Sequence, residues 1–296
     1  MKNNTRIAPS PTGDMHLGTA RTAYFNYLAA RSSGGEFTLR IDDTDASRNK
    51  QEHVDVILET MEWLGLDYDR LVYQSESNLY NIYADQLVKD GMAEVLENGA
   101  IALTPDSDRF IPSTWNDTIA GDITVSDKEK SIISRSILIK GDGTPAYNFA
   151  TAADDLGMVT NRVIRGHDHI NNTAKQLTFM NAMIASYILA GIPDYEAFSE
   201  IPTYTHVGLI HVNKKKLSKR DGAASMLKYR ADGYSPDAIL NFMLRLGWSE
   251  TSGNTIKKIT KDMAIDIFLN EGKMRNQSSN MDLALLDSMQ RKYKKS

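Results

Sequence analysis

Residues 11–19, PTGDMHLGT, decide the first part of the fold, because here a proline- and glycine-rich turn runs into the start of a helix. The preceding Ile7-Ala8 has the composition of a short strand. Apolar residues then recur at helical spacing over residues 17–31, and alternating apolar residues predict a strand over 37–41. A second helical stripe over residues 54–64 stops at a glycine. This strand–helix–strand–helix order predicts a parallel sheet covered by helices.

The rest of the chain divides into segments that differ in their predicted secondary structure. Short β-rich pieces at 100–103, 119–125 and 132–139 alternate with polar turns, which predicts a small α+β insertion. Val163-Ile164 predicts a further strand, and Ser235-Pro236 predicts a helix start in a mainly helical C-terminal part. We therefore expect four segments: the first half of a Rossmann-type α/β domain (1–91), the insertion (92–143), the second half of the α/β domain (144–224) and a helical region (225–296).

Composition narrows the class of protein. The chain has 296 residues, 41% hydrophobic and 24% charged, with a net charge of −4 and no cysteine. No stretch approaches the roughly 18 apolar residues that a membrane helix needs. The lack of cysteine excludes disulfides and thiolate metal sites, and the acidic balance disfavours non-specific binding of nucleic acid over the whole surface. We expect a monomeric cytoplasmic protein that does not bind a membrane and that contacts nucleic acid only through local basic patches.

Two segments suit a nucleotide. The helix start within residues 11–19 presents N–H groups to a phosphate, Gly18 allows close approach to the backbone, and His16 could donate a hydrogen bond. Residues 216–222, KLSKRDG, would suit a mobile basic loop over a polyphosphate. Neither GxGxxG nor GxxxxGKS occurs in these segments. Taken singly, a histidine at a helix start is more often a cap or a surface residue, and the second segment is more often an exposed basic loop.

The two segments in this order resemble the HIGH and KMSKS motifs of class I aminoacyl-tRNA synthetases. Four further blocks resemble bacterial glutamyl-tRNA synthetases in family order. The blocks are RIAPSPTG at 6–13, RIDDTD at 40–45, GTPAYNFA at 143–150 and VIRGHDHINNT at 163–173. The resemblance covers most of the chain and implies the class I synthetase catalytic fold.

The resemblance also implies roles for particular positions. The positions that match glutamate-binding residues are Arg6, Ser10, Asp42, Tyr147, Thr151 and Arg165. Those that match the ATP site are His16, Gly18, Thr19, Asp168, His169, Leu209, Ile210, Lys216, Lys219 and Arg220. Asp45 and Arg48 match positions near the terminal adenosine of tRNA. An arginine pair suits glutamate because a guanidinium binds a carboxylate through two hydrogen bonds.

The implied reaction joins glutamate to ATP and then to the 3′ end of a tRNA. The glutamate carboxylate would attack the α-phosphorus in line, so catalysis needs positioning and charge stabilisation by His16, Lys216 and Lys219 rather than a protein nucleophile. Mg²⁺ would arrive with ATP. The family's cysteine-containing zinc-binding part is missing, so we expect no zinc or other bound metal.

Three positions depart from the family pattern. Asp42 stands where many members carry glutamate, Thr151 where asparagine is expected, and His167 where an acid is common. These differences bear on the choice of amino acid. No part of this sequence resembles the anticodon-binding domains of the ordinary bacterial enzyme. We therefore expect recognition of tRNA to rest on its acceptor stem and its 3′ end.

Two alternatives stay open. Glutamyl-queuosine tRNA(Asp) synthetases also lack the anticodon-binding domain and glutamylate a modified base of tRNA. The blocks DTD at 43–45, HINNT at 169–173 and KRDG at 219–222 favour the charging enzyme over it. A non-catalytic tRNA-binding paralogue is the other alternative, and the retention of His16, Lys219 and the substrate arginines argues against it.

Overall fold

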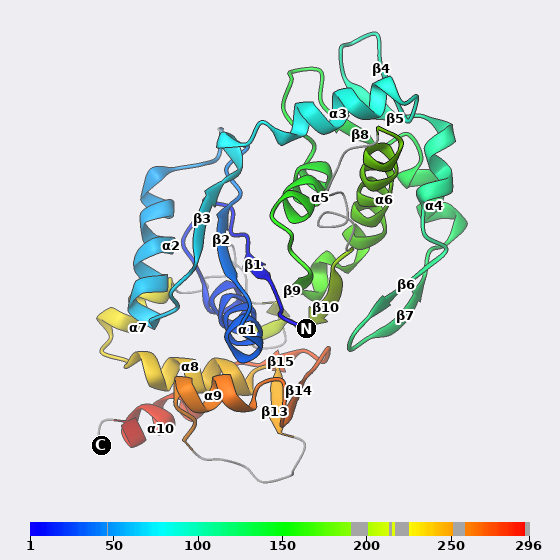
Figure 1. Cartoon of the computed structure of the whole chain (residues 1–296). Helices are drawn as coiled ribbons and strands as arrows, with labels where there is room; N and C mark the ends of the chain where they lie inside the picture. The colour runs from blue at the N-terminus through cyan, green and yellow to red at the C-terminus, as the bar shows by residue number, and fades with distance from the viewer. Residues whose placement is uncertain (46, 191–200, 213–214, 217–224, 251–257, 294–296) are drawn as a thin grey trace. The chain divides into compact units, whose positions relative to one another are not determined.

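The computed structural model describes residues 1–45, 47–190, 201–212, 215–216, 225–250 and 258–293 (Figure 1). Its contacts divide the chain into two compact units. Unit 1 comprises Met1–Tyr73, Val163–Asp168 and Thr205–Ser296, and unit 2 comprises Gln74–Arg162 and His169–Tyr204. Each unit is described by itself. This division differs from the four segments expected from the sequence, which remain a prediction.

Unit 1 contains the parallel sheet that the sequence predicts. Strands β1 (Thr5–Ile7), β2 (Phe37–Ile41) and β3 (Arg70–Tyr73) lie in the order β1-β2-β3, and both pairs are parallel. All five residues of β2 are buried, including the polar Thr38 and Arg40. The alternating pattern of 37–41 therefore does not mark a solvent-facing side, because β2 is the middle strand and is covered on both faces.

Two helices accompany this sheet (Figure 1). Helix α1 (Leu17–Ser33) ends at Gly34, and α2 (Gln51–Leu64) ends at Gly65, both as the sequence predicts. Val54, Ile57, Met61 and Leu64 form the buried stripe of α2. Helix α1 is instead buried on nearly every side from Ala20 to Ala30, which explains why its apolar pattern has little amphipathic contrast.

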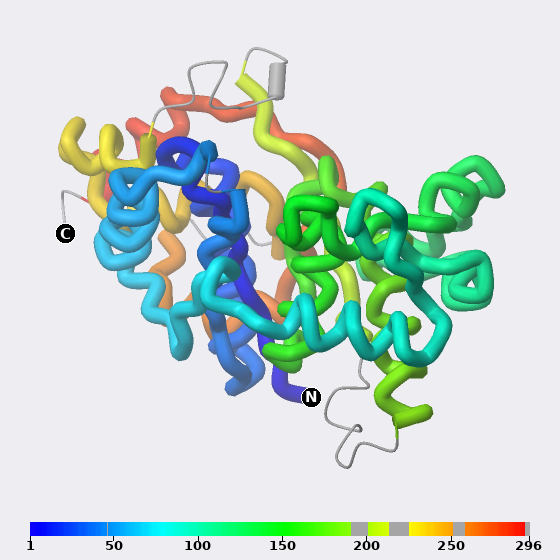
Figure 2. Tube along the Cα trace, turned by 90° about the horizontal axis from the view of Figure 1, so that it is seen from above, coloured from blue at the N-terminus to red at the C-terminus, as the bar shows by residue number. Residues whose placement is uncertain are grey.

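The remainder of unit 1 is mainly helical, as predicted. Helix α8 begins at Pro236, and the Ser235 hydroxyl caps it by accepting a hydrogen bond from the Ala238 N–H. Strands β11 and β15, far apart in the chain, run side by side and are parallel (Figure 2). The elements of this part are β11 (Ile210–Val212), β12 (Lys215–Lys216), α7 (Met226–Ala231), α8 (Pro236–Arg245), β13 (Trp248–Glu250), α9 (Lys261–Ile267), β14 (Gly272–Met274), β15 (Ser279–Asn280) and α10 (Leu283–Tyr293).

Three of the described helices of unit 2 pack around a core of aromatic and aliphatic side chains, among them Tyr83, Leu87, Phe149 and Phe179. Its helices are α3 (Leu79–Lys89), α4 (Asp127–Ile133), α5 (Tyr147–Gly157) and α6 (Thr173–Leu189). Its strands are β4 (Ala93–Val95), β5 (Ile101–Leu103), β6 (Thr114–Asp117), β7 (Gly121–Thr124) and β8 (Ile137–Ile139). Strands β4, β5 and β8 form an antiparallel sheet, and β6 and β7 form a hairpin.

The sequence prediction of a β-rich piece over 132–139 is wrong in its first residues. Ile132 and Ile133 belong to helix α4, and only the end of the piece forms β8. The cause is local: Ser126 and Glu129 form a capping box that starts a helix at Asp127. The strand predicted at Val163-Ile164 is confirmed as β9 (Arg162–Gly166), and β10 (Thr203–Val207) is its neighbour.

Within the described ranges, no helix combines the length and the apolar character required to cross a membrane.

Candidate active site

His16 is the residue that starts helix α1. Its Nδ1 accepts hydrogen bonds from the backbone N–H groups of Gly18 at 3.1 Å and Thr19 at 3.3 Å. An imidazole nitrogen that accepts carries no proton, so a neutral His16 holds its proton on Nε2. The cap and the ligand-binding role expected from the sequence are therefore compatible, because they use different nitrogens of one ring.

Gly18 leaves room for the His16 imidazole. A Cβ at this position would lie 3.1 Å from both Cε1 and Nδ1 of His16. The sequence suggested that Gly18 leaves room for a ligand, and the structure adds that it leaves room for the ring that caps the helix. Both residues lie at the N-terminus of a 17-residue helix, where the helix dipole favours an anion.

Two more of the predicted ATP-site residues meet around Gly166 at the end of β9. A Cβ on Gly166 would lie 2.5 Å from Oδ1 of Asp168 and 3.6 Å from Cδ2 of Leu209. The side chains of Asp168 and Leu209 therefore both approach this glycine. Ile210 is buried and begins β11, where it pairs with Ser279.

Arg21 is a buried residue of this region that sequence reasoning missed. Its Nη1 donates to the Leu246 carbonyl at 2.5 Å and its Nη2 donates to the Gly208 carbonyl at 2.6 Å. Burial lowers the pKa of Arg21 to about 10, opposed by the charge of Asp168. Arg21 therefore ties helix α1 to the segment before Leu209 and to the end of α8. The sequence did carry a signal for this burial, because Arg21 stands one turn beyond Leu17 on the apolar face of the predicted helix.

The two arginines predicted to bind glutamate carboxylates are both buried, with relative exposures of 4% for Arg6 and 7% for Arg165. Helix α1 holds the strands that carry them. Asn26 Nδ2 donates to the Ile164 carbonyl at 2.8 Å, and the Thr5 hydroxyl donates to the Asn26 carbonyl at 2.8 Å. Thr5, next to Arg6, and Ile164, next to Arg165, are thus both hydrogen-bonded to Asn26 of helix α1.

Arg165 has a partner that sequence reasoning missed. Its Nε donates to Nε2 of His206 at 2.9 Å, and His206 is fully buried in β10. A histidine within a β-rich stretch offers no sequence signal for this contact, since the two residues are 41 positions apart.

Asp42, the residue expected to meet the substrate ammonium, is already paired. Its Oδ1 accepts from Arg40 Nε at 2.7 Å and its Oδ2 accepts from Arg40 Nη2 at 3.2 Å. Both side chains are almost fully buried. The pair lies at the end of the middle strand β2, so it is not at a sheet edge. Ser10, by contrast, is exposed in the loop after β1.

Three predicted residues belong to unit 2. Tyr147 and Thr151 stand one helical turn apart in α5, with Tyr147 47% exposed at the helix start and Thr151 3% exposed. Among the described residues, the Thr151 hydroxyl oxygen has no hydrogen-bond partner. A buried hydroxyl without a partner is costly, so a ligand group at this position would stabilise it. His169 is half-buried, and its Nδ1 lies 3.5 Å from Nδ2 of Asn172.

The residues predicted near the tRNA terminus form an exposed cluster. Asp45 accepts hydrogen bonds from the Ser47 hydroxyl at 2.7 Å and from Arg48 Nε at 2.6 Å. The hydrogen bond from Ser47, followed by that from Arg48, lowers the pKa of Asp45. Asp45 therefore stays ionised, and Arg48 is held by it at the surface.

The basic loop is only partly described. The backbone of Lys216 lies in β12 and pairs with His211 of β11. Lys219 and Arg220 lie outside the described residues, so their predicted roles rest on the sequence. In the part of the chain that the structure describes, no group of three or more His, Cys, Asp or Glu side chains could hold a metal ion.

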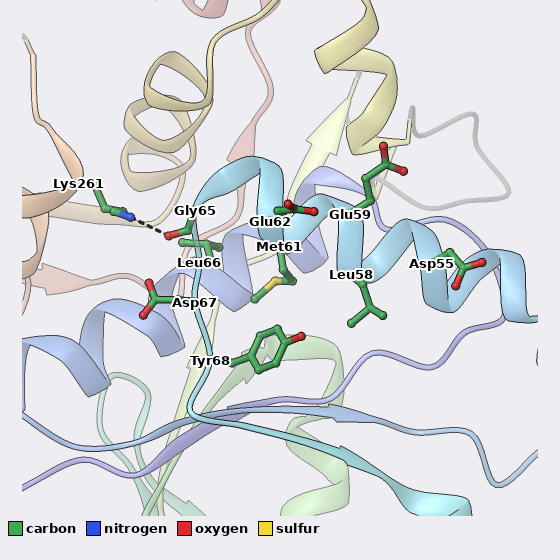
Figure 3. Close-up of a pocket in the computed structure, with 10 residues that line it drawn as sticks. All are labelled: Asp55, Leu58, Glu59, Met61, Glu62, Gly65, Leu66, Asp67, Tyr68 and Lys261. Atoms are coloured by element: carbon green, nitrogen blue, oxygen red, sulfur yellow. Dashed lines mark hydrogen bonds between the residues drawn. The ribbon is translucent and has the colours of Figure 1, made fainter.

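A pocket of about 790 Å³ lies along α2, and none of these residues belongs to its lining (Figure 3). Its lining combines an apolar floor with four carboxylates and one lysine: Asp55, Leu58, Glu59, Met61, Glu62, Gly65, Leu66, Asp67, Tyr68 and Lys261. Lys261 closes one end by donating to the Gly65 carbonyl at 2.7 Å. Carboxylates repel phosphate, so this pocket does not suit the nucleotide expected from the sequence.

The chain is similar to known proteins in sequence and in fold. The family model for tRNA synthetases class I (E and Q), catalytic domain, matches residues 2–103 and 96–285. A glutamate–tRNA ligase of Syntrophotalea carbinolica is 40% identical over 285 residues, which cover 84% of this chain and 58% of that protein. Glutamate–tRNA ligase 1 of Helicobacter hepaticus is 40% identical over 283 residues, covering 83% of this chain and 57% of its own length. The chain thus spans less than two thirds of these relatives.

The fold of the chain is also similar to that of a solved structure. The glutamate tRNA ligase of Elizabethkingia meningosepticum, determined in complex with its amino acid, superimposes with a TM-score of 0.76 at 27% sequence identity. The superposition covers 99% of this chain and 70% of that chain.

Proposed function

The chain belongs to the family of class I tRNA synthetase (E and Q) catalytic domains, and from this premise we propose that it ligates glutamate to tRNA using ATP. The residues divide into an ATP end around His16 and an amino-acid end around Arg6 and Arg165. The observation that carries the proposal is the His16 cap, which fixes the imidazole at the N-terminus of α1 with its proton on Nε2.

The first step is the attack of a glutamate carboxylate oxygen on the α-phosphorus of ATP. The bond from that phosphorus to the bridging oxygen breaks, and pyrophosphate leaves; Mg²⁺ that arrived with ATP would supply charge neutralisation. His16 donates from Nε2 to a phosphate oxygen as charge develops, and the helix N-terminus adds its dipole. Lys216 and Lys219 act on the leaving pyrophosphate; for Lys219 and Arg220 the support is the motif alone.

The second step is the attack of a ribose hydroxyl at the tRNA 3′ end on the glutamyl-adenylate. The ester forms as the bond from the acyl carbon to the adenylate oxygen breaks, AMP leaves, and the hydroxyl proton passes to the AMP phosphate or to water. Asp45 and Arg48 stand beside the terminal adenosine in this proposal, with Arg48 held by its ion pair. The chain would act as a monomer in the cytoplasm.

Amino-acid choice rests on charge. Arg6 and Arg165 would bind the two carboxylates, and Asp42 would meet the ammonium. In unit 2, the buried hydroxyl of Thr151 in α5 has no protein partner among the described residues, which supports a ligand group at that position. Tyr147, exposed one turn earlier, would cover the substrate.

The test measures glutamate-dependent exchange between pyrophosphate and ATP, with and without tRNA, followed by acid-gel analysis of the tRNA. The tRNA is an in vitro transcript, which carries no modified base. A shifted band with the transcript, lost when its terminal adenosine is removed, is the result expected for 3′-end ligation.

Other outcomes separate the alternatives. Exchange without any product on the transcript, but with glutamate transfer to modified cellular tRNA, would replace the proposal with base glutamylation. The absence of exchange with glutamate under every condition would overturn both enzymatic functions and leave tRNA binding. Arg165→Met, which removes one carboxylate ligand without adding charge, should abolish exchange at ordinary glutamate concentrations.

A further inference from the structure

His206 is a fully buried histidine whose contact with Arg165 has a defined direction. The two residues come from neighbouring strands, β10 and β9. Arg165 Nε donates to His206 Nε2 at 2.9 Å, at a position where both side chains are buried. A guanidinium has no acceptor atom, so the histidine nitrogen must be the acceptor. The proton of a neutral His206 therefore lies on Nδ1.

This bond fixes the plane of the Arg165 guanidinium. The group is planar with five N–H donors, and anchoring Nε sets the direction of the two terminal nitrogens. Those terminal nitrogens are the ones that bind a carboxylate in a forked arrangement. An acceptor at Nε consequently decides where a bound carboxylate would lie.

The chemistry of the acceptor also matters. Arg40, in the same unit, is held by the carboxylate of Asp42, so its positive charge is neutralised by its partner. At the Nε of Arg165 the acceptor is instead an imidazole nitrogen, which orients the guanidinium and adds no negative charge. A neutral acceptor preserves the attraction of an arginine for an anionic ligand, and that attraction is large in a buried site.

We propose that His206 is a positioning residue for amino-acid binding, which aims Arg165 at a substrate carboxylate without itself adding a negative charge. The inference rests on the proposed function, since it specifies how one end of that site is built. His206 has no contact with ATP in this proposal, so its substitution should change the binding of glutamate and not that of ATP.

The kinetic test compares His206→Leu with His206→Gln in the exchange assay. The leucine lacks an acceptor, whereas the glutamine amide oxygen can accept from Arg165 Nε. His206→Leu should raise the KM for glutamate about tenfold or more, as expected when a hydrogen bond to a charged group is lost. The KM for ATP should change less than twofold, and His206→Gln should recover much of the loss.

Gln74→Leu is the matched control, because it also removes a buried hydrogen bond, from Gln74 Nε2 to Asp154 Oδ2 at 2.6 Å in unit 2. It should destabilise the chain while leaving the KM for glutamate unchanged. If the effect of His206→Leu came only from loss of stability, the exchange rate would fall while both KM values stayed unchanged, as in Gln74→Leu, and the inference would be overturned.

A spectroscopic readout is independent of activity. In ¹⁵N-histidine-labelled protein, His206 should show the proton on Nδ1 and His16 the proton on Nε2, giving opposite tautomers within one spectrum. The six histidines are assigned by comparison with single variants. Arg165→Met should move the Nε2 signal of His206 and leave His16 in place; a proton on Nε2 of His206 would overturn the inference.

The two proposals fail in different ways. Wild-type protein without glutamate-dependent exchange would overturn the proposed function, and with it the amino-acid role of His206. Active wild-type protein, together with an unchanged KM for glutamate in His206→Leu, would overturn only the role of His206.

Discussion

His16 performs two tasks with two nitrogens, so two substitutions should separate them. His16→Ala removes both the cap and the Nε2 donor. His16→Asn replaces the imidazole Nε2 donor by a shorter amide and keeps a side-chain oxygen, which is among the best helix caps. If Nδ1 serves α1 and Nε2 serves the nucleotide, stability and activity should respond differently in the two variants.

The expected changes follow from the geometry. Nδ1 accepts from two backbone N–H groups, at 3.1 and 3.3 Å, and loss of such a cap costs about 1 kcal/mol of unfolding free energy. His16→Ala should therefore lower Tm by about 2–4 °C, and His16→Asn by much less. Both variants should lose about a hundredfold to a thousandfold in exchange rate, as when a donor to developing charge is removed.

Partial unfolding cannot produce such a loss. A domain stable by about 5 kcal/mol that loses about 1 kcal/mol still has only roughly one molecule in a thousand unfolded at 25 °C. Thr260→Ala serves as the control, since the Thr260 hydroxyl caps α9 by accepting from the Met263 N–H at 3.3 Å. It should lose similar stability and keep its exchange rate.

The measurements are urea unfolding and pyrophosphate exchange at saturating ATP and glutamate. Exchange at the wild-type rate in His16→Ala, which has no side-chain donor, would show that the imidazole is only a cap, and the assignment of Nε2 to the nucleotide would be wrong. Unchanged stability in His16→Ala would show that the two cap bonds contribute nothing.

Three further substitutions test neighbouring features. Gly18→Ala places a methyl group 3.1 Å from the His16 ring, so the exchange rate should fall about tenfold with little change in urea unfolding; an unchanged rate would show that the ring can move aside. Arg21→Met leaves two backbone carbonyls without their donor and should cost about 2–5 kcal/mol in urea unfolding, whereas a loss below about 1 kcal/mol would mean that water replaces the guanidinium. Burial alone would raise the pKa of Asp69, but a backbone N–H and the Arg31 guanidinium lower it overall. The stabilisation that the Asp69 carboxylate provides is therefore present above its pKa in the unfolded chain and is lost as pH falls through its pKa in the folded chain. Between pH 5 and pH 2, the unfolding free energy of the wild type should fall by about 0.5–1 kcal/mol more than that of Asp69→Asn, after allowance for solvent screening.

Local patterns in the sequence determined most of the elements of unit 1. The helix after residues 11–19 and the helix that stops at Gly65 both form as predicted, because caps and glycine stops act within a few residues. Ser235-Pro236 likewise starts α8. A similar local signal, the capping box at Ser126, was overlooked in the insertion, where apolar isoleucines suggested a strand.

Local patterns did not reveal how the buried polar side chains are paired. Asp42 was identified as a substrate ligand, but its engagement by Arg40 through both oxygens depends on the backbone conformation at the end of β2. The burial of all of β2 likewise depends on helices supplied by other parts of the chain. Such pairs are specified by the energetic need to satisfy buried charge rather than by spacing.

By itself the sequence determined the family resemblance, the parallel sheet and the identity of His16 and the two arginines as candidate ligands, because residue type and order carry that information. Only the tertiary structure decided that His16 caps its own helix through Nδ1, that Arg21 ties α1 to two distant carbonyls, and that His206 holds Arg165. The physical reason is that a hydrogen bond depends on direction and on the absence of competing water, and both arise only when strands and helices distant in sequence are packed together.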